Sequence, residues 1–168
     1  MRPGVIRTAL LTAMLGLPAR AAGDDCDRLA KLLGEAASRK AVKRVAVAPF
    51  LSPRGDASYA GAVLAERIVT RLLSRGGLEL MERPLLESVL KEQKLGLFGI
   101  MEPRTARALG RVLGVDAILT GTAVELRGGR VESNARLIHA ETAQVLAAAT
   151  VQVPKDWEEP AGSDLGGS

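Results

Sequence analysis

The stretch Val112-Leu-Gly-Val-Asp-Ala-Ile-Leu-Thr-Gly-Thr-Ala123 decides the fold of this 168-residue chain. Its apolar pattern is typical of the last turn of a helix, a tight stop at Gly114 and then a buried strand. Strand and helix patterns alternate before it, whereas only strand patterns follow it. This change predicts an α/β fold with a mixed β-sheet: a β-α-β-α-α unit and then a three-stranded antiparallel meander, in a single domain.

The meander is predicted from the central stretch onward. Residues 115–126 form its first strand, and Arg127-Gly-Gly-Arg130 forms a hairpin turn, because paired glycines allow the positive φ angles that a tight turn needs. The return strand, Val131 to His139, alternates apolar and polar residues. A second turn at Glu141–Ala143 leads to the last strand, Gln144 to Val153.

A β-α-β unit is predicted upstream of the central stretch. The apolar run Arg44–Phe50 is typical of a buried central strand, which we expect to end at Pro49. Asp56 or Ser58 can cap the helix that follows. The short run Leu78–Met81 predicts a second strand. Such a unit should be right-handed, with its two strands parallel.

Three more helices are expected from apolar residues at helical spacing. The first runs from Asp27 to Lys40 and packs on the domain, with a partner-binding helix as the alternative. The others open at Pro84 and Pro103, because proline suits the first helical position, and an apolar loop at Leu97–Met101 separates them. The residues expected to face inward are Leu29, Leu32, Leu33 and Ala36, then Leu85, Leu86, Val89 and Leu90, then Ala106, Leu109, Val112 and Leu113.

The N-terminus has the three parts of a secretory signal peptide. Arg2 and Arg7 are its basic region, residues 8–17 are its apolar region, and Ala19-Arg20-Ala21 supplies small residues for cleavage before Ala22. The apolar run is too short for a spanning helix. An uncleaved helix in the cytosol is the alternative. Cleavage would remove three arginines and no acid, which lowers the net charge from +4 to +1 and removes the main electrostatic reason to expect nucleic-acid binding.

These patterns divide the chain into four parts. Residues 1–21 are the signal peptide, 22–43 an N-terminal helical segment, 44–153 the α/β domain and 154–168 a disordered tail. The tail is polar and rich in glycine, and its Trp157 is expected to touch the domain loosely. The apolar fraction of 47% is enough for a packed core within one domain of this length.

Cys26 is the only cysteine, so an internal disulfide is impossible. Asp24 and Asp25 precede it, whereas a lipid-modified cysteine directly follows small uncharged residues. We therefore expect no lipid anchor at this cysteine. Two interpretations stay open: a solvent-exposed thiol near the terminus, or a disulfide to a partner or a second copy.

The sequence contains no recognisable catalytic set. It lacks the phosphate-binding loop and the dinucleotide fingerprint. His139 is the only histidine, so neither a zinc site nor a Ser-His-Asp set is expected. Asp116 is interpreted as a hydrogen-bonding turn residue, and Glu82-Arg83 as a structural ion pair with an anion site as the alternative. We predict no catalytic, cofactor-binding or metal-binding residue, no cofactor and no enzymatic activity, and expect Arg104, Arg107 and Arg111 to form a solvated face.

A series of short motifs extends from about Arg44 to Val153. The motifs are Val45-Ala-Val-Ala-Pro-Phe50, Leu64-Ala-Glu-Arg67, Leu80-Met-Glu-Arg83, Leu90-Lys-Glu-Gln-Lys-Leu95, Leu113-Gly-Val-Asp-Ala-Ile-Leu-Thr-Gly121 and Ala135-Arg-Leu-Ile138 with Glu141-Thr142. Together they resemble the CsgG/FlgO superfamily of bacterial envelope proteins, although no single motif is diagnostic. His139 and Ala143 stand where the family commonly has Asp and Thr-Gly.

The resemblance implies a periplasmic domain similar to the N-terminal domain of TolB. Family members act in flagellar, secretion or cell-wall assembly through protein contacts. We therefore expect a non-catalytic accessory protein in the periplasm, possible association with the outer membrane, envelope proteins as partners and a possible homo-oligomer. The alternative is a ligand-binding module or one like the activators of peptidoglycan synthases. The CsgG branch forms a pore, but this chain has no room for the extra hairpins, so we expect no pore and no membrane-spanning segment after cleavage.

Overall fold

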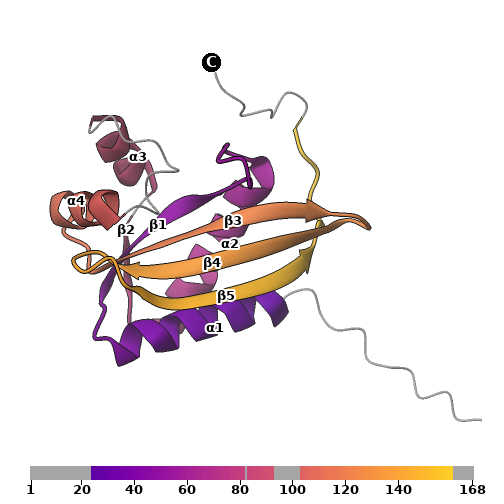
Figure 1. Ribbon diagram of the computed structural model, residues 1–168. Coiled ribbons are helices and arrows are strands. Elements are labelled where there is room, and N and C mark those ends of the chain that lie inside the picture. Colours follow the sequence, from indigo (N-terminus) through magenta and orange to yellow (C-terminus); the bar gives the residue numbers. More distant parts are fainter. Residues whose placement is uncertain (1–23, 82, 93–102, 161–168) are drawn as a thin grey trace, which may run out of the picture.

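The computed structural model describes residues 24–81, 83–92 and 103–160 and contains one five-stranded mixed sheet (Figure 1). The sheet order is β2-β1-β3-β4-β5. Strand β1 pairs in parallel with β2 and β3, and β3, β4 and β5 form an antiparallel meander, so the predicted fold class is confirmed. The elements are α1 (Asp24–Arg39), β1 (Arg44–Leu51), α2 (Tyr59–Arg75), β2 (Glu79–Met81), α3 (Arg83–Glu92), α4 (Pro103–Leu113), β3 (Ala117–Leu126), β4 (Arg130–His139) and β5 (Val145–Pro154).

Several predictions fall outside the described residues. These are the signal peptide at 1–21, the Glu82-Arg83 ion pair, the apolar loop at 97–101 and the tail from 161 to 168. Residues 155–160 belong to the tail that was expected to be disordered. The structure describes them, contrary to that expectation. Trp157 packs against the core, so the ordered part of the chain extends beyond Val153.

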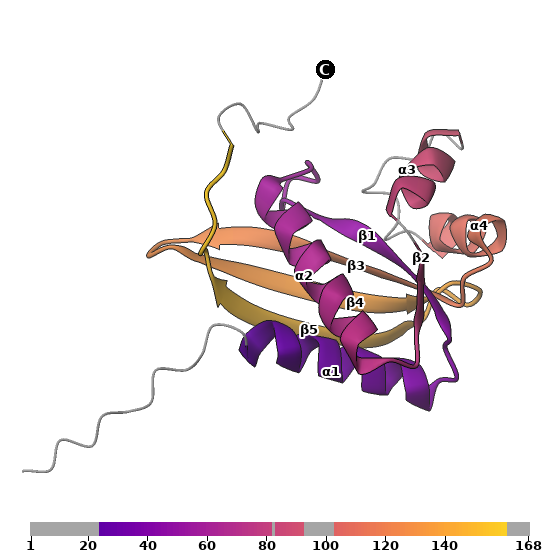
Figure 2. The same ribbon diagram turned by 180° about the vertical axis from the view of Figure 1, so that it is seen from behind.

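The helices cover the two faces of the sheet unequally (Figures 1 and 2). Helices α1 and α2 lie on one face and close the larger core over β1, β3, β4 and β5. On the other face, α3 and α4 close a smaller core around Ile118 and Ile138. They lie at one end of that face, and the rest of β3, β4 and β5 has no helix over it in the described chain.

Strand β1 does not end at Pro49, contrary to the prediction. Val47 pairs with Leu119 and Phe50 with Gly121, so β1 has one residue more than β3 between these pairs. This irregularity accommodates a proline, which lacks the N–H that a regular central strand would need. Leu51 therefore still belongs to the strand and is buried.

Two residues that were predicted to face inward are exposed. Helix α1 forms as expected but begins at Asp24, and its buried stripe includes Leu29 and Leu33. Leu32 is 43% exposed because the buried stripe that meets the sheet does not extend around the helix as far as this residue. On α4, Val112 is 54% exposed because α4 packs through Ala106 and Leu109 instead. The predictions for Leu32 and Val112 were wrong.

The predicted turns and caps are confirmed. Gly128 and Gly129, between β3 and β4, have φ angles of 78° and 67°. Gly114 has a φ of 63°, which lets the chain turn from α4 into β3. At the start of α2, the hydroxyl of Ser58 accepts a hydrogen bond from the backbone N–H of Gly61, which makes Ser58 the cap of the two candidates.

Candidate interaction surface

The residues with possible chemistry are used locally and do not converge. His139 Nδ1 accepts hydrogen bonds from the backbone N–H groups of Glu141 and Thr142, at 3.2 and 3.3 Å, and so closes the β4–β5 turn. Asp116 has the structural role that was predicted, because its Oδ2 accepts hydrogen bonds from the backbone N–H groups of Lys43 and Arg44. Within the described ranges, no three His, Cys, Asp or Glu residues lie close enough to hold a metal ion.

Cys26 is part of the core, which corrects the prediction of an exposed thiol. Its side chain is 1% exposed and belongs to the cluster between α1 and the sheet. Burial raises the pKa of its thiol because a thiolate would lose its hydration there. A disulfide to a partner would require this part of α1 to leave the sheet. The exposed-thiol interpretation is therefore wrong, and a disulfide to a partner or a second copy loses support.

The uncovered face of the meander carries a ladder of polar side chains. Asn134 on β4 lies between its register partners Thr122 on β3 and Thr150 on β5. Its amide contacts the Thr122 hydroxyl at 3.5 Å and accepts a hydrogen bond from the Thr150 hydroxyl at 2.7 Å. One rung further, Gln152 donates to Glu132 at 3.0 Å. These contacts hold the polar side chains in fixed positions on a broad surface.

Strand β5 forms one edge of the sheet, and the usual protection against pairing is confined to its two ends. Its ten residues include no charged side chain, and its only proline is the last residue. Monomeric proteins commonly place charges, prolines or bulges along such edges to prevent strand addition. The only register shift lies near the start of β5, between the pairs of Leu137 and Ile138. Most of the strand is therefore a regular, uncharged edge.

The register shows which backbone groups of β5 point away from the sheet. Lys155 N donates to Gly129 O at 2.7 Å. Hydrogen-bonded and non-bonded pairs alternate along an antiparallel ladder, so the N–H and C=O groups of Ala148, Thr150 and Gln152 point outward. Arg130 donates to the Gln152 carbonyl at 3.0 Å. A groove of about 350 Å³ adjoins this half of the edge and is lined by Asp25, Arg28, Arg130, Thr150, Val151 and Gln152.

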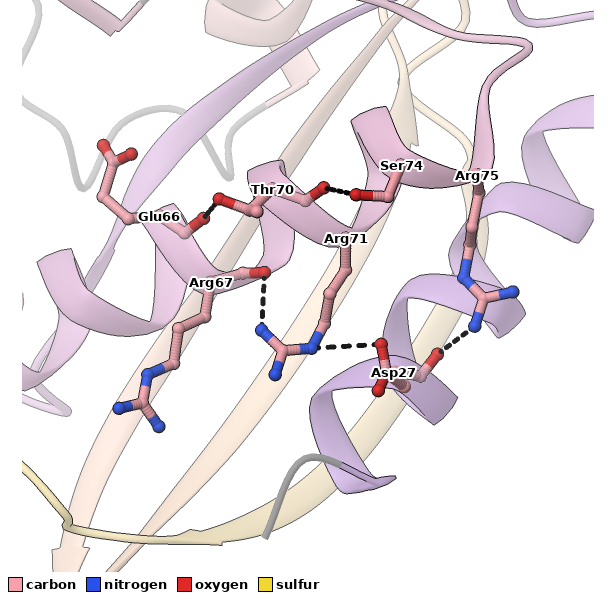
Figure 3. Close-up of polar contacts among 7 residues, drawn as sticks. All are labelled: Asp27, Glu66, Arg67, Thr70, Arg71, Ser74 and Arg75. Atoms are coloured by element: carbon pink, nitrogen blue, oxygen red, sulfur yellow. Dashed lines mark hydrogen bonds and ion pairs between the residues drawn. The ribbon is translucent and has the colours of Figure 1, made fainter.

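On α2, a row formed by Arg67, Arg71 and Arg75 holds the start of α1 and the segment that follows β5 (Figure 3). Arg71 Nε lies 3.1 Å from the Asp27 carboxylate, and Arg75 donates to the Asp27 backbone carbonyl at 3.1 Å. These contacts attach the start of α1 to α2. Sequence reasoning did not identify this role for the row, although its four-residue spacing was a visible signal.

Arg67, at the other end of the row, holds the segment that follows β5. Its guanidinium lies 2.6 Å from Asp156 and 4.9 Å from the centroid of the Trp157 ring. The same ion pair keeps the pKa of Asp156 below its ordinary value. Lys155 adds ion pairs to Glu125 and Glu159, at 3.0 and 2.8 Å. Residues 155–159 thus form a strap, and the strap fixes where β5 ends.

The family described as FlgO protein matches residues 26–158. No curated relative matches the chain. No helix of the described ranges is long and apolar enough to cross a membrane.

Solved structures share the fold at low sequence identity. The LpoB C-terminal domain from Escherichia coli is 13% identical with a TM-score of 0.60, covering 80% of this chain and 98% of that one. The same domain from Salmonella enterica is 14% identical with a TM-score of 0.58, covering 77% and 98%. A lipoprotein from Neisseria meningitidis is 21% identical with a TM-score of 0.52, covering 71% and 86%.

Proposed function

Because the chain belongs to the FlgO protein family, we propose that it is a non-catalytic accessory protein of the bacterial envelope that works by binding another protein. The observation that carries this proposal is the regular, uncharged edge of β5. An extended segment of a partner adds to this edge as a sixth strand, bonding to the outward N–H and C=O groups of Ala148 and Thr150 and to the outward N–H of Gln152.

The surroundings of the edge support strand addition. The groove beside β5 gives an added strand room next to α1, and Arg28 and Arg130 line it. The polar ladder on the open face supplies hydrogen-bonding groups close to the edge, which can select among partner side chains. Affinity would come from the backbone and specificity from these side chains.

The location in the periplasm is part of the proposal. The N-terminal pattern of residues 1–21 supports export, and the family resemblance supports an envelope protein. Fractionation of cells that express a C-terminally tagged chain tests it. We expect a periplasmic or membrane fraction and a mass consistent with cleavage before Ala22. An uncleaved chain in the cytosol contradicts the location and with it the accessory role.

A second candidate is a module like the activators of peptidoglycan synthases, with ligand binding in the periplasm as a related possibility. The fold shared with LpoB C-terminal domains over 98% of their length favours this candidate over an unrelated accessory role. At 13–14% identity the likeness concerns the fold, so the partner has to be identified by experiment.

Photocrosslinking in cells tests the binding edge. A photoreactive residue at Gln152 should capture an identified flagellar, secretion or cell-wall synthase component, whereas one at Leu73, an exposed position on α2, should not. A synthase as the captured protein selects the second candidate. Capture of only a second copy, or equal capture from Leu73, contradicts the proposed edge.

A matched pair of variants separates the backbone from the side chain. Ala148→Pro removes an outward N–H and leaves the β4 ladder intact, while Ala148→Val keeps that N–H and suits a strand. We expect Ala148→Pro to lower capture by about fivefold or more and Ala148→Val to leave it near the native level. Equal capture by both variants would show that β5 does not receive a strand.

A further inference from the structure

A cluster of exposed cations lies at the end of the sheet where β1 and β3 begin. Figures 1 and 2 show the end of α1, the end of α4 and the β4–β5 turn gathered there. Lys43 and Arg44 are tied to this end because their backbone N–H groups bind Asp116. The basic end, as we call it, consists of the exposed residues Lys40, Lys43, Arg44, Arg107 and Arg111.

Within the described ranges these cations have no counter-ion, which is also true of some isolated arginines such as Arg54 and Arg127. Elsewhere Arg67, Arg71 and Lys155 are held in ion pairs of 3.1 Å or less. None of the five cations of the basic end makes an ion pair with any residue of the described ranges. Among the described residues, the acids at this end are Glu79, Asp116 and Glu141, and the carboxylate of Asp116 already accepts two backbone hydrogen bonds. Positive charge therefore dominates here.

The basic end also contains a hollow beside two of its arginines. A space of about 290 Å³ between α4 and the β4–β5 turn is lined by Arg107, Gly110, Arg111, Val115, Ala140 and Glu141. At one side of the hollow, α4 packs closely on Ala140. Gly110 allows this contact, since a Cβ at position 110 would lie 2.3 Å from Ala140 Cβ. The end of α4 carries only about half a negative charge, less than the two guanidinium groups supply. Val115 also lines a smaller hollow, together with Arg44 and Glu79.

Two exposed apolar side chains accompany the cations. Val112 is 54% exposed next to Arg111, and Val145 is 55% exposed where the chain leaves the β4–β5 turn. Basic residues interspersed with exposed apolar ones are typical of protein surfaces that rest on anionic bilayers, where cations meet phosphates and apolar side chains enter the interface. An acidic protein would meet the charge but would leave the valines without a particular role.

We propose that the basic end docks on the anionic phospholipid headgroups of a membrane surface, with a headgroup phosphate bound between Arg107 and Arg111. The opposite end of the sheet, with the β3–β4 turn and the strap, then points away from the membrane. The edge of β5 runs between the two ends and stays open to a protein partner. Docking does not depend on that partner.

Vesicle co-sedimentation of the purified chain tests the proposal. We expect binding to phosphatidylcholine vesicles that contain about one third phosphatidylglycerol, no binding to pure phosphatidylcholine, and loss of binding at high salt. Arg107→Gln with Arg111→Gln should weaken binding about 25-fold, at roughly fivefold for each charge. Adding Val112→Ser to this double variant should weaken vesicle binding further without changing the salt dependence of binding.

The matched control removes two cations at the opposite end. Arg54→Gln with Arg127→Gln lowers the net charge equally, and both arginines are exposed. This variant should bind within about twofold of the native chain. The N-terminal segment is the same in all variants, so its contribution cancels. Circular dichroism checks that each variant is folded, and Ala148→Pro should bind vesicles like the native chain, which separates this test from the test of β5.

Three results would overturn the proposal. The first is no binding of the native chain to anionic vesicles. The second is equal weakening by the two double variants, which would show an effect of net charge alone. The third is retention on isolated peptidoglycan instead of vesicles, lost in the Arg107→Gln, Arg111→Gln variant, which would assign the basic end to an anionic wall polymer.

Discussion

Arg44 and Asp116 exchange two hydrogen bonds across the starts of β1 and β3. The backbone N–H of Arg44 donates to Asp116 Oδ2 at 2.9 Å, and the backbone N–H of Asp116 donates to the Arg44 carbonyl at 2.9 Å. Lys43 donates to the same carboxylate oxygen. One aspartate thus aligns two parallel strands that are 72 residues apart in the sequence.

The first prediction concerns the pH dependence of this contact. The backbone N–H groups of Arg44 and Lys43 hold the pKa of Asp116 below its ordinary value. The stabilisation is therefore present above the unfolded-state pKa and is lost as the pH falls through the folded-state pKa. Asp116→Ala should lower the free energy of unfolding by about 1–2 kcal/mol at neutral pH. Urea denaturation should show this difference shrink towards pH 3, and a constant difference would contradict the assignment.

The second prediction concerns the strap. Trp157→Ala removes the contact with Arg67 and the packing on the core, and should lower the free energy of unfolding by about 1–3 kcal/mol. Hydrogen exchange should become faster in residues 155–159. Trp157→Phe keeps an apolar ring and should lose less. In a double-mutant cycle with Arg67→Ala, a coupling energy of zero would show that the two side chains act independently.

The third prediction compares two helical glycines. A Cβ at Gly61 would lie 1.8 Å from the Phe50 carbonyl oxygen, so Gly61→Ala must separate α2 from β1. We expect a loss of about 3 kcal/mol or more in the free energy of unfolding. At Gly34 the nearest atom to an added Cβ is 3.9 Å away, and Gly34→Ala should stabilise the chain by about 0.5–1 kcal/mol. Thermal denaturation distinguishes the two, and similar melting temperatures would contradict this packing.

The fourth prediction concerns the reactivity of Cys26. Because its side chain is buried and its pKa is raised, the thiol should react with a disulfide reagent about a hundredfold or more slowly than in the unfolded chain. The measurement is the rate of thiol release with and without urea. A fast reaction of the folded protein would restore the exposed-thiol interpretation.

Local patterns were sufficient for the secondary structure and the family. Helical spacing, paired glycines and the change of pattern at Gly114 predicted the β-α-β unit, the meander and the mixed sheet. The FlgO part of the predicted resemblance is confirmed. The wider grouping with CsgG and the likeness to TolB stay predictions. So do the secretory signal and the partner, because they concern processing and contacts outside this chain.

Tertiary packing decided the details that the patterns left open. Cys26 is buried and Leu32 exposed because the angle at which α1 meets the sheet selects one stripe of the helix, and residue types alone do not set that angle.

The position of each strand in the sheet is likewise a property of the whole fold. An uncharged strand such as β5 has the same local pattern in the middle of a sheet as at its edge. Its outward backbone groups, and the gathering of cations from the end of α1, β1 and α4, exist because distant segments assemble around one sheet. The sequence by itself determined the elements and their order, and the tertiary structure decided which surfaces they expose.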